Sequence, residues 1–86
     1  MRLYYLAFML AAIASPALAS PQCTSEPESK WMPEADMRAK AEAAGNKIDV
    51  FKRTKGSCYE IYGRDGSGKR IEIYYNPVTG DIVQAS

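Results

Sequence analysis

Two glutamates, Glu60 and Glu72, are the residues whose type and spacing could perform chemistry. Both lie in segments where apolar and polar residues alternate, and a period of two places them on one face of a β-sheet. Glycosidases use two carboxyl groups on one surface as an acid and base pair. Here they are diagonal neighbours interleaved with Tyr62 and Tyr74 on an open surface, so we expect their pKa values to stay close together. Such similar pKa values argue against an acid and base pair, so we expect a non-enzymatic protein without catalytic residues.

Metal and cofactor chemistry has little support in the sequence. The chain has no histidine, which removes the usual general base and the commonest metal ligand. The segment 65–68 lacks the further carboxylates of a calcium loop and the Lys-Ser/Thr ending of a phosphate loop, and a hairpin turn explains it. We therefore expect no cofactor and no metal.

The first 19 residues have the features of a secretory signal peptide. Arg2 is followed by an apolar stretch over 3–14 and by an Ala-Leu-Ala cleavage signal ending at Ala19. We expect cleavage after Ala19 and a periplasmic or secreted protein, without stable membrane insertion. A retained membrane anchor is the less favoured alternative, because the apolar stretch is short for a bilayer.

Composition restricts the partners of the remaining chain. Without residues 1–19, 67 of the 86 residues remain, enough for one small domain, with ten basic and ten acidic side chains. This balance disfavours nucleic acid and anionic membranes as main partners, because both require a basic excess. The local surplus of lysines and arginines in 47–70 is best explained as a solvated rim near turns.

The two cysteines, Cys23 and Cys58, are expected to form one disulfide in an oxidising compartment. A redox-active or metal-binding pair is the alternative, and it is disfavoured because the chain has no C-x-x-C motif and no histidine.

The order of elements predicts an α+β fold. Residues 20–30 should be an irregular arm, and a helix should begin near Pro33 and end near Gly45. Four strands should follow, joined by a two-residue turn at 55–56, a three-residue loop at 66–68 and a four-residue loop at 77–80. The prediction is one N-terminal helix packed on a four-stranded antiparallel meander sheet, with one disulfide. The expected core is Met37, Ala41, Ala44, Ile48, Val50, Tyr59, Ile61, Ile71, Ile73, Tyr75 and Ile82.

The opposite face of the sheet combines aromatic side chains with carboxylates. Two interpretations remain open: the arm and Trp31 cover part of these aromatics, which we favour, or the aromatics stay exposed and bind a partner. The candidate partner-binding face consists of Phe51, Glu60, Tyr62, Glu72 and Tyr74.

Several segments in this order resemble the PepSY family of small exported proteins. They are Cys23, Trp31-Met32, the helix ending at Gly45, and the strand and turn segments 58–61, 65–66, 68–70, 72–74 and 76–80. The resemblance covers nearly the whole chain after residue 19, with residues 31–86 as the PepSY-like domain. It implies a helix packed on an antiparallel sheet, as in the propeptides of thermolysin-like metalloproteases, where the domain is associated with restraining the protease. It implies no catalytic residues.

The sequence therefore predicts a non-enzymatic exported module that binds another exported protein, plausibly a peptidase regulated or inhibited in trans. The contact would use an edge of the sheet and the aromatic face. The alternative is a small-ligand or envelope-stress module with no protease role. A subunit of a larger assembly is a weaker third possibility.

Overall fold

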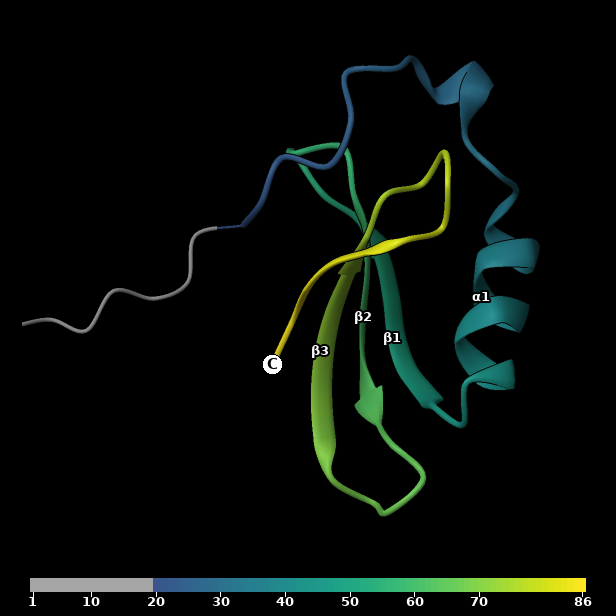
Figure 1. The fold of residues 1–86 in the computed structure, drawn as a ribbon, viewed down its shortest axis with the longest axis vertical. Helices are drawn as coiled ribbons and strands as arrows, with labels where there is room; N and C mark the ends of the chain where they lie inside the picture. The colour runs from purple at the N-terminus through teal and green to yellow at the C-terminus, as the bar shows by residue number, and fades with distance from the viewer. Residues whose placement is uncertain (1–19) are drawn as a thin grey trace, which may run out of the picture.

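The computed structural model describes residues 20–86, so the predicted signal peptide, residues 1–19, lies outside the described part. The four strands form one antiparallel sheet in the order β1-β2-β3-β4, with α1 on one side of it (Figure 1). This confirms the predicted α+β fold. Within residues 20–86, no helix has the length and apolar character needed to cross a membrane. The elements are η1 (Glu28–Lys30), α1 (Glu34–Ala43), β1 (Lys47–Arg53), β2 (Tyr59–Arg64), β3 (Arg70–Tyr75) and β4 (Ile82–Ala85).

Helix α1 begins and ends where the sequence predicts. Pro33 precedes its first residue, where its missing N–H costs no helical hydrogen bond. At the other end, Gly45 has a φ of 96° and donates to the Glu42 carbonyl at 2.9 Å, and Asn46 donates to the Ala41 carbonyl at 3.3 Å. This paired bonding is a Schellman motif, which requires the left-handed conformation that glycine adopts without strain.

The hairpin between β2 and β3 sets the central register of the sheet. Asp65 donates its N–H to the Lys69 carbonyl at 2.8 Å, which closes the predicted three-residue loop. Gly68 in this loop has a φ of 87°. As predicted, Ile61 lies opposite Ile73, so both side chains point toward α1.

The hairpin between β1 and β2 differs from the prediction. Its loop contains three residues, 55–57, because the Thr54 N–H bonds to the Cys58 carbonyl at 3.0 Å and Ser57 adopts a φ of 61°. The extra residue shifts the neighbouring register and places Phe51 opposite Ile61.

A β-bulge between Ile48 and Val50 then corrects this shift. Ile48 lies opposite Gly63, as predicted, but Val50 lies opposite Tyr62 and not opposite Ile61. Gly63 is essential for this close approach, because a Cβ there would lie 1.9 Å from the Lys47 carbonyl oxygen. The longer loop and the bulge together reverse the faces of residues 50 and 51.

The core lies between α1 and the sheet, and three residues predicted to belong to it are exposed. Ala44 is the C-terminal cap of α1, Val50 is turned outward by the bulge, and Ile82 lies on edge strand β4 beside an irregularity in the β3-β4 register. The buried cluster consists of Met37, Ala41, Tyr59, Ile61, Ile73 and Tyr75, with Trp31, Met32, Ile48, Phe51 and Ile71 packed against it.

Two aromatic side chains expected on the opposite face belong to this core. The prediction that Phe51 belongs to the partner-binding face is wrong. The register shift turns the Phe51 ring toward the Tyr59 ring, with 5.1 Å between the ring centroids. Trp31 was expected to cover the opposite face, but its ring meets Tyr59 edge-on at 5.3 Å. The Tyr59 hydroxyl also donates to the Met32 carbonyl at 2.7 Å, which holds the segment before α1 on the core side.

Candidate binding face

The side of the sheet that faces away from α1 carries alternating aromatic and charged residues. We call it the outer face. The register places Glu60 opposite Tyr74, and Tyr62 opposite Glu72. The four side chains predicted to share a face therefore do so. The outer face consists of Val50, Lys52, Glu60, Tyr62, Arg64, Arg70, Glu72 and Tyr74.

The predicted Cys23–Cys58 disulfide is present, with the two Cα atoms 5.1 Å apart. It holds the arm, residues 20–30, against the end of the sheet (Figure 1). Two hydrogen bonds of the Cys23 backbone support this position: its N–H donates to the Gly56 carbonyl at 2.9 Å, and its carbonyl accepts from the side-chain Nδ2 of Asn76 at 3.1 Å. The arm approaches so closely that a Cβ on Gly56 would lie 2.2 Å from the Pro21 carbonyl oxygen.

The arm divides the outer face into a covered and an open half. Tyr74 is buried, and its hydroxyl lies 3.5 Å from Ser20 Oγ at the start of the arm. Tyr62, farther from the arm along β2, keeps 39% of its surface exposed. Of the two interpretations of the aromatic face, covering by the arm is correct for Tyr74, and exposure is correct for Tyr62.

The covered half buries one member of the carboxyl pair. Glu60 is only 3% exposed, and this burial raises the pKa of its carboxyl group, an effect that hydrogen bonding to Glu72 increases. Hydrogen bonds from Glu60 first, and also from Tyr74 at 2.9 Å, lower the pKa of Glu72. The expectation that the two pKa values stay close together is therefore wrong, because the outer face is open at only one end.

The geometry explains how the buried pair is stabilised. Among residues 20–86, Glu60 Oε2 has no hydrogen-bond partner while both carboxyl groups are ionised, because neither of them can then donate. A proton on this oxygen can be donated to the Glu72 carboxylate, which gives the buried atom the partner it lacks. The neighbouring Tyr62 hydroxyl interacts with both carboxyl groups. Hydrogen bonding to Glu60, the larger effect, and to Glu72 raises the pKa of Tyr62 to about 12.

The two carboxyl groups differ in their access to solvent. Glu60 is closed off from solvent, so a substrate has no access to it. Within residues 20–86, no group of three or more histidine, cysteine or acidic side chains is placed to bind a metal ion.

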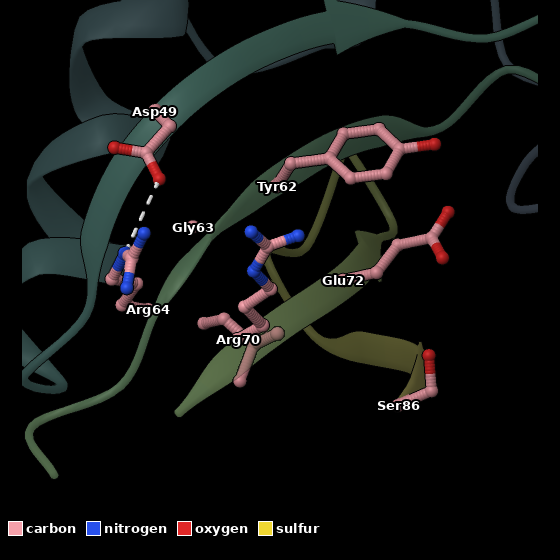
Figure 2. A pocket seen from close by; sticks show the side chains of 8 residues that line it. Asp49, Tyr62, Gly63, Arg64, Arg70, Glu72 and Ser86 are labelled. Atoms are coloured by element: carbon pink, nitrogen blue, oxygen red, sulfur yellow. Dashed lines mark ion pairs between the residues drawn. The ribbon is translucent and has the colours of Figure 1, made fainter. Parts of the chain in front are cut away.

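The open half contains a pocket of about 460 Å³ beside Tyr62 (Figure 2). The arginines here belong to the local basic surplus in 47–70, which the sequence explains as a solvated rim. Strand alternation could have predicted their position. Arg64 lies two residues after Tyr62, and Arg70 lies two residues before Glu72, so both arginines share the outer face with them. The pocket is lined by Asp49, Tyr62, Gly63, Arg64, Arg70, Ile71, Glu72 and Ser86.

Comparison with known families identifies the family of this chain. The family model PepSY_2, described as peptidase propeptide and YPEB domain, matches residues 3–86. This chain belongs to the PepSY family. The match spans nearly the whole chain and confirms the resemblance to the PepSY family. Comparisons with curated proteins and with solved structures found no match. The PepSY assignment relates the chain to peptidase propeptides.

Proposed function

We propose that this PepSY protein is an exported, non-enzymatic module that binds a peptidase in trans and restrains it. The observation that carries the proposal is the open half of the outer face, where exposed side chains lie next to a pocket. Val50 and Tyr62 keep 48% and 39% of their surfaces exposed and lie opposite each other on adjacent strands. Exposed aromatic and aliphatic side chains beside arginines are typical of the centres of protein interfaces.

The covered half supports the proposal by fixing the arm at one end of the outer face. The disulfide and the hydrogen bonds of Cys23 hold the arm on the sheet. A surface that is already ordered loses less conformational entropy when it binds.

The proposal is tested by titrating the purified, disulfide-bonded protein against a thermolysin-type metallopeptidase that cleaves a fluorogenic peptide. We expect the initial rate to fall to a plateau with increasing protein, while mass spectrometry shows the PepSY chain intact. Restraint by binding leaves the chain uncleaved, whereas a competing substrate is degraded.

A serine peptidase assayed in the same way is the control for non-specific effects. An unchanged metallopeptidase rate at protein concentrations up to 100-fold above the enzyme contradicts the proposal, and so does inhibition that disappears as the PepSY chain is digested.

A further inference from the structure

Arg70 stands in the pocket without a partner of its own. Three of the four arginines in residues 20–86 have one: Arg38 lies over the Phe51 ring, Arg53 pairs with Glu28, and Arg64 pairs with Asp49. Arg70 has no hydrogen bond, ion pair or aromatic ring as partner among these residues. Figure 2 shows its side chain between Arg64 and Glu72, in the middle of the pocket.

Arg70 forms no ion pair within residues 20–86, although the carboxylates of Asp49 and Glu72 also line the pocket. Arg70 lies directly opposite Arg64 on the adjacent strand, and like charges in this position destabilise a sheet. Glu72 lies in the same pocket without pairing with Arg70, and its carboxylate accepts a hydrogen bond from the Tyr74 hydroxyl at 2.9 Å. An anion bound between the two guanidinium groups would relieve their repulsion.

The pocket suits a carboxylate attached to a peptide. A guanidinium group binds carboxylate through two parallel hydrogen bonds, and a volume of about 460 Å³ is in the range of ligand pockets. Tyr62 and Ile71 add apolar surface next to the arginines. We infer that this pocket binds an acidic side chain of an extended peptide, flanked by an apolar residue that packs on Tyr62. The inference deepens the proposed function, because it specifies which segment of a partner the outer face selects.

Nuclear magnetic resonance titration of the whole disulfide-bonded chain tests this inference. The probes are three compounds: the blocked tripeptide acetyl-Leu-Glu-Leu-amide, the same peptide with Gln in place of Glu, and inorganic phosphate. We expect the Glu peptide to shift the Arg70 Nε–Hε and Tyr62 amide signals at low salt, and to bind about fivefold more tightly than the Gln peptide.

The variant Arg70→Gln should weaken binding of the Glu peptide about fivefold, because it removes the guanidinium group that has no ion pair within the protein. Lys69→Gln removes the same charge from the adjacent, exposed position and should leave the affinity within about twofold. Equal affinity for the Glu and Gln peptides overturns the inference. Tighter binding of phosphate than of the Glu peptide, or equal affinities of the two variants, overturns it as well.

The peptidase assay separates this inference from the proposed function. If Arg70→Gln inhibits the metallopeptidase as well as the unaltered protein does, the acidic-peptide pocket is refuted as the selecting site and the proposed function stands. If the Glu peptide binds through Arg70 and the peptidase is not inhibited, the pocket stands and the peptidase role is refuted.

Discussion

Glu60 and Glu72 have different electrostatic environments although both belong to the outer face. Glu60 lies at the end covered by the arm, where desolvation favours its neutral form. Glu72 lies closer to the open half and accepts hydrogen bonds, which favours its charged form. The difference between the two carboxyl groups thus depends on a segment that is distant in sequence.

Replacing the buried carboxyl group should change how stability depends on pH. The folded-state pKa of Glu60 is raised, so its stabilising contribution is complete below its unfolded pKa and is lost as pH rises through the folded value. We expect Glu60→Gln to match the unaltered protein near pH 4 and to exceed its unfolding free energy by about 1–3 kcal/mol at pH 8.

Urea unfolding at a series of pH values measures this difference, with Glu42→Gln on the exposed part of α1 as the matched control. The depressed pKa of Glu72 acts in the opposite direction, because its contribution is lost as pH falls, and in Glu60→Gln the part of it that depends on the Glu60 carboxyl group changes as well. A stability difference between Glu60→Gln and the unaltered protein that stays constant with pH contradicts the shared proton.

Strand β1 shows which parts of the fold could be predicted and which could not. The β2-β3 hairpin followed directly from alternation and from its glycine-containing loop, and Ile61 pairs with Ile73 as expected. The β1-β2 loop is longer because Ser57 adopts a positive φ, which its residue type does not indicate. The bulge near Val50 then restores the register, so the prediction was correct at Ile48 and wrong at Val50 and Phe51.

The candidate site was predictable to a similar degree. Strand alternation correctly grouped Glu60, Tyr62, Glu72 and Tyr74, because their parity is a local property of the chain. The burial of Glu60 was missed, since it depends on how the arm lies over the sheet, which periodicity does not encode. The same dependence on tertiary contacts separates Tyr62, which is exposed, from Tyr74, which is buried.

The close approach at the bulge gives a direct test of the β1-β2 arrangement. In Gly63→Ala, the new Cβ meets the Lys47 carbonyl oxygen, a backbone atom, at 1.9 Å, so β1 must move. We expect a loss of about 1–3 kcal/mol in the free energy of unfolding, measured with urea. Gly66→Ala is the control, because its nearest neighbour would be the Gly45 carbonyl oxygen at 3.8 Å, and its effect should stay within about 0.5 kcal/mol. Equal losses in the two variants contradict the tight pairing of the strands.

In the molecule as a whole, one disulfide makes the two ends of the sheet differ, because it holds the arm over one end and not over the other. The Cys23–Cys58 disulfide closes a separation of 35 residues, for which the loss of chain entropy in the unfolded state corresponds to about 4 kcal/mol. The same bond holds the arm over Tyr74 and leaves Tyr62 free. The outer face thereby combines a half that the arm covers with a half in which Tyr62 is exposed to solvent.

The most direct test of a binding role for the open half compares two exposed apolar residues in the peptidase titration. Tyr62 lies on the outer face, whereas Ile82, 58% exposed, lies on edge strand β4 opposite Tyr75 of the core. We predict that Tyr62→Ala raises the concentration needed for half inhibition about fivefold or more, and that Ile82→Ala changes it less than about twofold. Equal inhibition by both variants, with unchanged melting temperatures, would contradict the central claim that the partner binds the outer face.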